Sequence, residues 1–359
     1  MRLLFITPRF LPEIGGVEKH VNYVANELVR QGHLVKIITS TYRNTLKSIE
    51  PKNRLKVYRV FLTIHSKHPL HVILHLIKIW IYLIKIFGLL IDQDAIHLHD
   101  YQTFLWVFPF LPLIRKPIFM TFHGFESYPP PKHARIIRKM AEKVVKGNIC
   151  VGSFITRWYG TKPNYTTIGG VETSETPLCN NHVEEAAVFI GRLTEDTGIL
   201  EYIKALKILK KKYHVELPLH ICGDGPLRNK ILEYARCNDL KIFIHGFVEN
   251  PQKFLIRYRY AFVSGYLSIL EAMSLKRPVF AIYTNNLKRD YLYSIPNAKK
   301  LMFVIGSPNE MAEKLYSLIK NPEEIEPFIK HAYAFAKEQT WEKVANLYLK
   351  LYREKGLKC

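Results

Sequence analysis

Short apolar segments alternate with longer amphipathic segments along the chain, which is the pattern of strands and helices in α/β proteins. In the first half, a fully apolar run predicts a buried parallel strand at 3–7, and further strands are expected at 34–39, 55–61, 95–98, 117–122 and 148–151. Apolar positions at helical spacing predict helices at 17–31, 71–91, 102–113 and 132–145. This alternation predicts a doubly wound parallel sheet.

The same alternation returns in the second half. Strands are expected at 187–190, 217–222, 242–245, 260–264 and 278–282, and helices at 198–212, 227–237, 252–257 and 268–274. The polar stretch 172–185 lacks periodicity and is the expected linker. We therefore predict two doubly wound, Rossmann-like domains that face a central cleft. Their expected bounds are 1–175 and 176–338, and the C-terminal helix within 339–359 is expected to cross back over the first domain.

The helix expected at 71–91 is the most apolar one in the chain. Its polar positions share one face, since they follow one another at spacings of four, three and seven: His71, His75, Lys78 and Lys85. Two lysines near its middle argue against a membrane span. The sequence favours a helix packed on its own sheet, with a helix that also dips into a membrane surface as the alternative.

Composition and charge narrow the function. The 359 residues are 48% hydrophobic and 23% charged, as in a globular protein, and the formal net charge is +21. Such an excess favours anionic partners, namely nucleotides, phosphorylated lipids or an anionic membrane surface. No motif of a nucleic-acid-binding module occurs, so nucleic acid is not an expected partner. Five scattered cysteines without a CxxC pair indicate reduced thiols in a cytoplasmic protein.

The segment 263–282 carries the main candidate chemistry. It reads as a strand end, a turn at Gly265, a helix with Glu271 near its start, and a further strand. A helix that follows a strand offers free backbone N–H groups and a positive dipole end to a phosphate. The Glu271 carboxylate could accept hydrogen bonds from a ribose diol. The alternative is an ordinary strand–turn–helix in which Glu271 complements the dipole.

Two further positions lie where open α/β sheets bind their ligands. His123 directly follows an apolar strand and precedes Gly124, which places it at the carboxyl end of the sheet. Gly15 and Gly16 come between the first strand and its helix and allow the backbone to approach a ligand. These glycines do not form a GxGxxG fingerprint. His123 could also be a hydrogen-bonded strand-end residue, and the glycines a tight turn.

Six short motifs occur in an order and spacing that resemble a known family: GGVEKHV after the first strand, TFHG, IGR, ICGDGP, HGFVEN and ILEAMSLKRPV. Nearly the whole chain resembles the retaining glycosyltransferases of family 4, which have the GT-B fold. The resemblance implies a nucleotide-sugar donor held mainly by the second domain, an acceptor read by the first, and catalysis without a metal or other cofactor. The acceptor would be a glycan or a lipid-linked molecule at the cytosolic membrane face.

The resemblance also implies roles for individual residues. The amides at Gly15 and Gly16 would approach the donor phosphates, and Arg192 would bind the pyrophosphate. Glu271 would hold the ribose diol, and His123 would face the transferred sugar. The remaining donor contacts are the amides near Leu267 and Ser268 at the phosphates and the backbone of Phe247 and Val248 at the base. His123, Arg192 and Glu271 form the expected catalytic set.

Two positions depart from the family pattern. Thr197 stands where a lysine of the phosphate clamp is usual, and Val263 stands where an acidic residue usually contacts the donor sugar. Lys204 or Lys253 could replace the missing cation. The alternative to an active enzyme is a catalytically weak or inactive subunit that binds a nucleotide or a partner enzyme. A sugar-nucleotide epimerase is a third reading, with no further paired carboxylate and histidine to support it.

Overall fold

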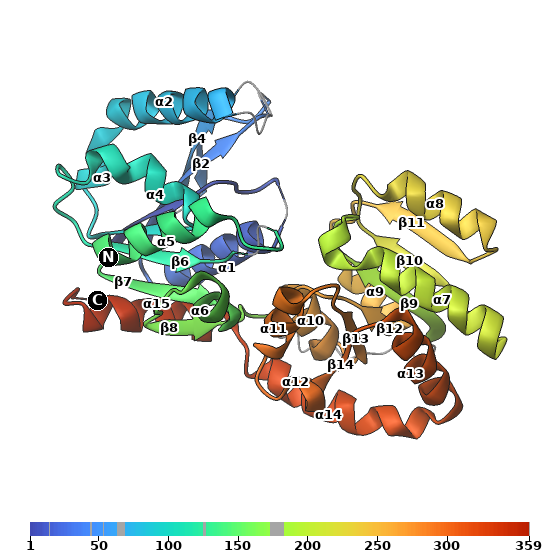
Figure 1. The fold of residues 1–359 in the computed structure, drawn as a ribbon. Helices are drawn as coiled ribbons and strands as arrows, with labels where there is room; N and C mark the ends of the chain where they lie inside the picture. The colour runs from blue at the N-terminus through green and yellow to red at the C-terminus, as the bar shows by residue number, and fades with distance from the viewer. Residues whose placement is uncertain are drawn as a thin grey trace. The chain divides into compact units, whose positions relative to one another are not determined.

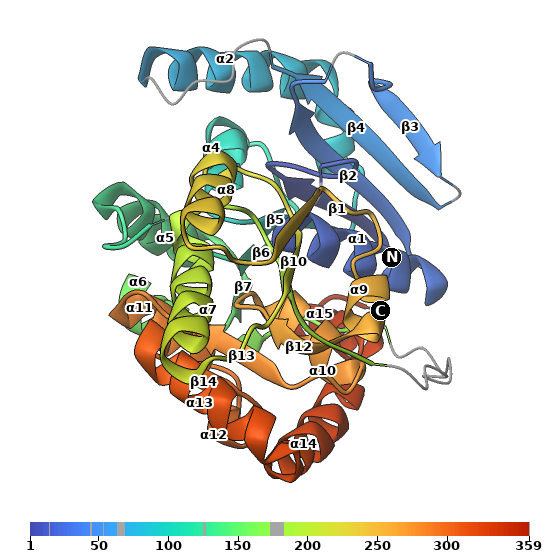
Figure 2. The same cartoon turned by 90° about the vertical axis from the view of Figure 1, so that its right-hand side faces the viewer.

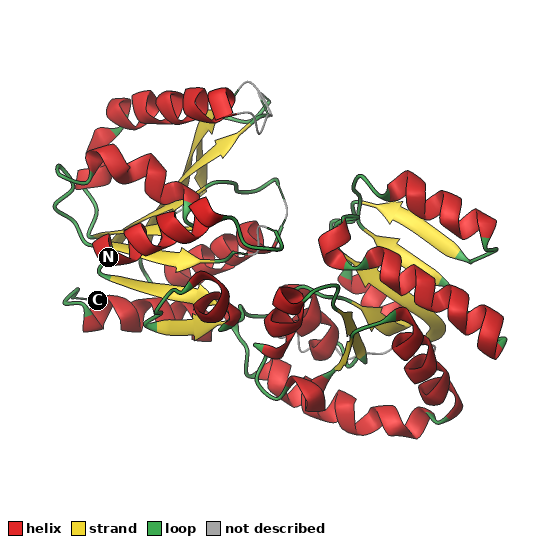
Figure 3. Ribbon diagram, in the orientation of Figure 1, coloured by secondary structure: helices red, strands yellow, loops and turns green. Residues whose placement is uncertain are grey.

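The computed structural model describes residues 1–13, 15–43, 45–52, 54–62, 69–124, 127–172 and 183–358. The chain divides into two compact units, one formed by residues 1–167 with 341–359 and the other by residues 168–340. Each is a sheet flanked by helices (Figure 3). Most of the linker expected at 172–185 lies outside the described residues.

The first unit contains eight strands and the C-terminal helix of the chain (Figure 1). Its elements are β1 (Arg2–Thr7), α1 (Gly16–Arg30), β2 (Leu34–Thr41), β3 (Ile49–Lys52), β4 (Leu55–Phe61), α2 (Pro69–Lys85), α3 (Phe87–Ile91), β5 (Ala95–His99), α4 (Gln102–Val107), the 3-10 turn η1 (Phe108–Phe110), β6 (Ile118–Phe122), α5 (Lys132–Val144), β7 (Gly147–Val151), α6 (Phe154–Tyr159), β8 (Tyr165–Thr167) and α15 (Trp341–Glu354).

The strands of this sheet follow the order β3-β4-β2-β1-β5-β6-β7-β8. All pairs are parallel except β3 with β4. The order reverses between β1 and β5, so the ends of these two strands form the topological switch point. Helix α15 packs against α1, where Trp341 stacks on Tyr23 with ring centroids 4.9 Å apart.

The second unit has six parallel strands. Its elements are β9 (Glu184–Ile190), η2 (Glu195–Thr197), α7 (Ile199–Tyr213), β10 (Leu219–Cys222), α8 (Arg228–Cys237), β11 (Ile242–Gly246), α9 (Gln252–Arg257), β12 (Tyr258–Phe262), α10 (Tyr266–Ser274), β13 (Val279–Ile282), α11 (Asn286–Tyr293), α12 (Ala298–Leu301), β14 (Phe303–Ile305), α13 (Pro308–Lys320), η3 (Pro322–Ile325) and α14 (Glu326–Lys337). The sheet order β11-β10-β9-β12-β13-β14 is that of a dinucleotide-binding fold.

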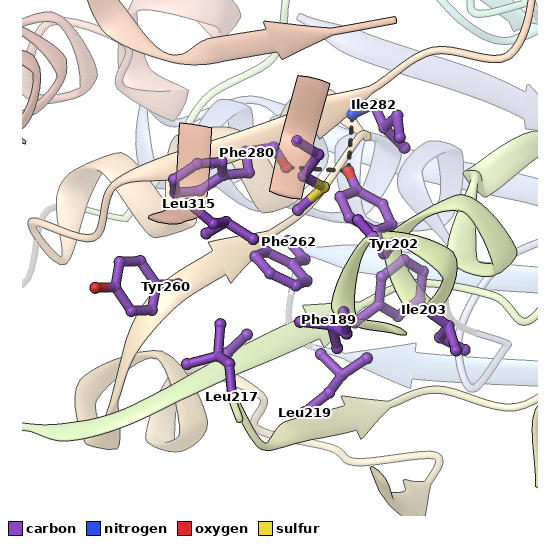
Figure 4. Packing of buried hydrophobic residues seen from close by; sticks show 14 of the residues in the cluster. Phe189, Tyr202, Ile203, Leu217, Leu219, Tyr260, Phe262, Phe280, Ile282 and Leu315 are labelled. Carbon is purple, nitrogen blue, oxygen red and sulfur yellow. Dashed lines mark hydrogen bonds between the residues drawn. The ribbon is translucent and has the colours of Figure 1, made fainter. Parts of the chain in front are cut away.

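The core of the second unit centres on Tyr202 of α7 (Figure 4). Its ring stacks on Phe262 at 5.1 Å, and its hydroxyl donates to the carbonyl of Phe280 and accepts from the amide of Ile282. These bonds tie α7 to β13 and satisfy a buried polar group. Because β12 and β13 are fixed in this way, the loops at their carboxyl ends start from a rigid base.

The structure corrects two of the expected helices. The helix expected at 71–91 begins at Pro69 and breaks at Ile86, whose backbone leaves the helical region (φ −112°, ψ 23°) before α3 starts. Two β-branched residues, Ile84 and Ile86, together with Gly88 lower helix propensity at this point. The helix expected at 102–113 ends at Val107 and continues only as a 3-10 turn. Pro109 in that turn lacks the amide hydrogen of a continuing helix.

Candidate active site

Strands β9 and β12 meet at the topological switch point of the second sheet. They are parallel neighbours, and Phe189 of β9 pairs with Phe262 of β12. Arg192 and Gly265 each come three residues later and leave the sheet at the same edge. Open α/β sheets bind ligands at this edge. The sequence-predicted residues of the segment 263–271 and Arg192 are thus brought to one place in the fold.

The Gly223–Gly225 turn supports the backbone that carries Arg192. A Cβ atom at Gly223 would clash with the carbonyl oxygen of Gly191, so this close approach requires glycine. The amide of Leu193 donates to the Asp224 carbonyl over 3.0 Å, and the amide of Leu227 donates to the Leu193 carbonyl over 3.1 Å. The ICGDGP motif therefore acts through the backbone next to Arg192.

Arg192 presents its guanidinium to solvent. Its side chain is 72% exposed, and its Nη2 lies 3.1 Å from the Asp196 carboxylate. Such an exposed ion pair adds little stability and can be exchanged for another anion. The Thr197 hydroxyl donates to the carbonyls of Arg192 (3.0 Å) and Thr194 (2.7 Å). Thr197 therefore holds the shape of this loop, without supplying the positive charge of a lysine.

Helix α10 points its N-terminus to the same edge. Its N-cap, Gly265, makes no side-chain capping bond, and the Tyr266 amide donates to the Tyr291 hydroxyl over 2.9 Å. The amides of Leu267 and Ser268 have no protein acceptor among the residues that the structure describes. Two free N–H groups at a helix N-terminus suit a phosphate oxygen.

Glu271 lies in the second turn of α10, since the helix begins at Tyr266 and not near Ser268 as expected. It is half-buried. This position is too far along the helix for a first-turn charge that complements the dipole, because that effect is confined to the first turn. Val263 is fully buried and donates its amide to the Phe280 carbonyl. Its side chain belongs to the hydrophobic core.

Lys288 of α11 is a member of this region that the sequence analysis missed. Its side chain is 6% exposed, and its Nζ donates to the Ser264 carbonyl over 2.7 Å. Burial lowers the pKa of Lys288 to about 8; nearby Asp196 raises this pKa and Arg192 lowers it. Of the two lysines that could replace the missing cation, Lys204 pairs with Glu201 on α7, and Lys253 is exposed on α9.

Phe247 and Val248 follow β11, which is the edge strand of the second sheet. Phe247 is 62% exposed. Two strands, β10 and β9, separate β11 from β12, so the fold does not bring this pair to the same strand end as Glu271. The exposed ring is nonetheless available to a flat apolar ligand such as a base.

His123 follows β6 in the first unit and belongs to a cluster of four histidines. Its Nε2 lies 3.2 Å from His99 Nδ1, and its ring meets His20 edge-on at 4.9 Å. Burial, with His97 and Arg138 as further causes, lowers the pKa of His123 to about 3. Its imidazole is therefore neutral at physiological pH and can offer one donor and one acceptor.

The rest of the cluster joins β5 and β6 to α15. His97 lies within hydrogen-bond distance of the Tyr352 hydroxyl and of Thr121, at 2.8 Å each, and His20 lies 3.0 Å from the Tyr348 hydroxyl. Burial lowers the pKa of His20, His97 and His99 well below its usual value. The described residues contain no group of three or more His, Cys, Asp or Glu side chains that could hold a metal ion.

Gly15 and Gly16 lie at the start of α1, as expected. Gly15 is the N-cap, in extended backbone and without a side-chain capping bond. A Cβ atom at Gly16 would meet no atom within 4 Å, so open space lies in front of this glycine. At Gly15 a Cβ atom would meet the carboxylate of Glu18, in the first turn of the helix. The Glu18 carboxylate thus lies beside the Gly15 backbone.

Lys288, His97 and His99 belong to these two clusters but were not predicted, because their sequence patterns indicate little about burial. Lys288 occurs in the polar run NNLKRDYLY, in which nothing separates a buried lysine from an exposed one. His97 and His99 stand in a strand whose five positions are all buried, IHLH after Ala95. That alternation of histidine with aliphatic residues could have indicated buried imidazoles with tertiary partners.

Two family models match the chain, Glycosyltransferase Family 4 over residues 14–161 and Glycosyl transferases group 1 over residues 177–335. An uncharacterized glycosyltransferase of Methanocaldococcus jannaschii is 25% identical over 291 residues, which are 69% of this chain and 70% of the relative.

Solved glycosyltransferases share the fold. Sucrose-phosphate synthase from Thermosynechococcus elongatus is 15% identical, with a TM-score of 0.75 and 98% of each chain covered. A variant of S. aureus TarM in complex with fondaparinux, α-GlcNAc-glycerol and UDP is 16% identical, with a TM-score of 0.76 over 98% of this chain and 100% of that one. The two matched segments together cover most of the sequence, and the chain belongs to the family 4 (group 1) glycosyltransferases of the GT-B fold.

Proposed function

We propose that this glycosyltransferase moves a hexosyl group from a nucleotide-sugar donor to a glycan or lipid-linked acceptor, with retention of the anomeric configuration and without a metal ion. The cytosolic face of a membrane is the proposed place of reaction. The observation that carries the proposal is the group at the β9/β12 switch point: an exposed guanidinium, two free helix amides and a carboxylate one turn further along α10.

Each member of this group has a task that fits its chemistry. Arg192 would exchange the Asp196 carboxylate for the donor diphosphate, which a planar, multi-donor cation binds well. The amides of Leu267 and Ser268 would bind phosphate oxygens at the positive end of α10. Glu271 would accept hydrogen bonds from the ribose diol. Cationic and dipolar groups would thus stabilise the leaving diphosphate in the absence of a metal.

The first unit supplies the proposed contact to the transferred sugar. His123 is neutral, so it can accept a hydrogen bond from a sugar hydroxyl or donate one without carrying a charge. A neutral group does not repel the positive charge that develops at the anomeric carbon of an oxocarbenium-like transition state. The complex of the structural relative TarM with UDP supports a uridine nucleotide as the first donor to try.

The test is a screen of nucleotide sugars for transfer and for donor hydrolysis. We expect turnover of one donor, retention of the anomeric configuration in the product, and full activity in the presence of a chelator. His123→Ala should lower kcat by about two orders of magnitude, in the range seen when one transition-state contact is removed. The absence of transfer and of hydrolysis in a folded, nucleotide-binding protein would contradict the proposal.

A second function has specific support. Val263 is buried and Thr197 is neutral, so two contacts that the family pattern provides are missing. A subunit that binds a nucleotide or a partner enzyme without turnover is consistent with both. If His123→Ala and Glu271→Ala leave the cellular glycans unchanged, while the wild-type protein still binds a nucleotide, this second function is favoured.

A further inference from the structure

Helix α2 exposes an aliphatic stripe on the face that points away from the body of the first unit. Each side chain of this stripe is between 42% and 63% exposed: Ile73, Leu74, Ile77, Ile81 and Ile84. Their spacings of one, three, four and three place them on one side of a helix. Contiguous exposed aliphatic surface of this kind marks an interaction site in a folded protein.

The opposite face of α2 is the one that packs. Ile79 and Leu83 are buried, and the Trp80 Nε1 donates to the Leu105 carbonyl of α4 over 3.1 Å. Both views show α2 along one edge of the first unit (Figures 1 and 2). One apolar face of α2 is therefore packed against the first unit, and a second apolar face is exposed to solvent. An ordinary surface helix has polar residues on that second face.

The charges on α2 are all of one sign. The helix has no Asp or Glu, and Lys78 and Lys85 follow the stripe along one edge and are exposed. Neither lysine forms an ion pair with another described residue. Long cationic side chains that flank an apolar stripe suit an interfacial helix, because their ammonium groups reach anionic headgroups while the stripe enters the acyl region.

A bilayer surface explains both features better than a protein partner does. No helix among the described residues is long and apolar enough to cross a membrane. A flat stripe of aliphatic side chains without aromatic or acidic members offers a protein partner little specificity. The formal net charge of +21 adds long-range attraction to an anionic surface.

We propose that the aliphatic stripe of α2, with Lys78 and Lys85 at its edge, is a docking surface for anionic lipid bilayers. The stripe residues enter the interface and Lys78 and Lys85 contact lipid phosphates. The inference deepens the proposed function, since it places the first unit at the surface where a lipid-linked acceptor resides. The docking itself requires neither donor nor acceptor.

The experiment is co-sedimentation of the full chain with vesicles of phosphatidylcholine, with and without phosphatidylglycerol, at low and high salt. We expect binding to the anionic vesicles, weaker binding at high salt, and a loss of about tenfold or more in Ile77→Glu/Ile81→Glu. Lys78→Glu/Lys85→Glu should weaken binding to the vesicles that contain phosphatidylglycerol and leave binding to pure phosphatidylcholine vesicles unchanged. The matched control is Leu232→Glu/Phe243→Glu, which changes two exposed apolar residues of the second unit.

Other outcomes would overturn the inference. One is equal sedimentation of the wild type and of Ile77→Glu/Ile81→Glu with the vesicles. The other is a wild-type protein that binds no vesicles and forms a dimer, when Ile77→Glu/Ile81→Glu is a monomer. The second outcome would assign the stripe to a second copy of the chain. Circular dichroism confirms that each variant folds. Nucleotide binding measured on the same variants should stay unchanged, so a failure of docking is distinguishable from a failure of the proposed transfer reaction.

Discussion

The Nζ of Lys288 donates a hydrogen bond to the backbone carbonyl of Ser264 over 2.7 Å, at the loop that leads into α10. Ser264 in turn donates its hydroxyl to the Thr197 carbonyl over 3.0 Å, and the Thr197 hydroxyl donates to the Arg192 carbonyl over 3.0 Å. One buried ammonium thus connects the loop that carries Arg192 with the loop that carries the free α10 amides. It also brings a positive charge close to a site proposed to bind a diphosphate.

Lys288 should therefore support nucleotide binding as a positioning residue. Lys288→Met keeps most of the side-chain volume and removes the charge and the bond to Ser264. We expect the affinity for a nucleoside diphosphate to fall about tenfold, or about 1.4 kcal/mol, by calorimetry. Lys288→Arg should retain part of the affinity, and Lys204→Met, which removes an exposed lysine paired with Glu201, should retain all of it. Equal affinity of Lys288→Met and the wild type would remove Lys288 from the site.

The same lysine predicts a pH dependence of binding. Burial lowers the pKa of Lys288 to about 8, so the free protein loses this positive charge as the pH rises through 8. A bound diphosphate favours the protonated form, so binding above pH 8 should take up a proton and weaken with rising pH. The proton uptake on binding should approach one above pH 8, and it should be absent in Lys288→Met. Calorimetric titrations in buffers of different ionisation enthalpy measure this proton uptake. An affinity that stays constant between about pH 7 and 9.5 would contradict the prediction.

Asp196 should compete with the donor for Arg192. The two side chains lie 3.1 Å apart at the surface, where the ion pair contributes about 1 kcal/mol or less. Asp196→Asn removes the competing carboxylate, and we expect a severalfold higher affinity for a nucleoside diphosphate. The affinity for the nucleoside alone should not change, because it lacks the phosphates. An unchanged or lower diphosphate affinity would show that Asp196 does not compete for the guanidinium.

The four histidines of the first unit should make the fold sensitive to acid. Their pKa values are lowered in the folded protein, to about 3 at His123, so the unfolded chain binds more protons below its ordinary pKa of about 6.5. The free energy of unfolding should fall as the pH falls from 6.5 toward 3, by up to about 1.4 kcal/mol per pH unit for each histidine.

A variant separates this effect from general acid denaturation. His99 Nε2 is buried and has no hydrogen-bond partner among the described atoms. His99→Gln should therefore reduce the acid slope of urea unfolding by about one proton, whereas His133→Gln, at an exposed position, should leave it unchanged. If the free energy of unfolding depends on pH equally in the wild type and in His99→Gln, the acid sensitivity does not come from His99.

Much of the fold follows from local patterns. The apolar run at 3–7 lies in a strand as expected, because a buried parallel strand has no polar face to obscure it. The short antiparallel strand β3 and the helices from α11 to α14 were not predicted. Strand β3 contains Pro51, and α11 mixes polar and aromatic residues without a clear stripe, so neither gives a strong periodic signal.

The candidate site was predicted less completely than the fold. Arg192 was named from the order of the motifs and Glu271 from its place on a helix that follows a strand, and the sheet order brings the loop of Arg192 and the start of that helix to one edge. Lys288 comes to the Ser264 loop from 24 residues away, and the exposure of the α2 stripe depends on which side of the helix meets α4. Such tertiary relationships are not encoded in spacing along the chain.

The most direct test of the account is calorimetric binding of UDP, GDP, ADP and CMP to the wild type, to Glu271→Ala and to Glu313→Ala. The control removes an exposed carboxylate from α13, away from the switch point. We predict that one nucleotide binds, that Glu271→Ala lowers its affinity about tenfold or more, as expected for a lost contact to a charged acceptor, and that Glu313→Ala does not. Binding of none of the four, or equal binding by wild type and Glu271→Ala, would contradict a nucleotide site at α10.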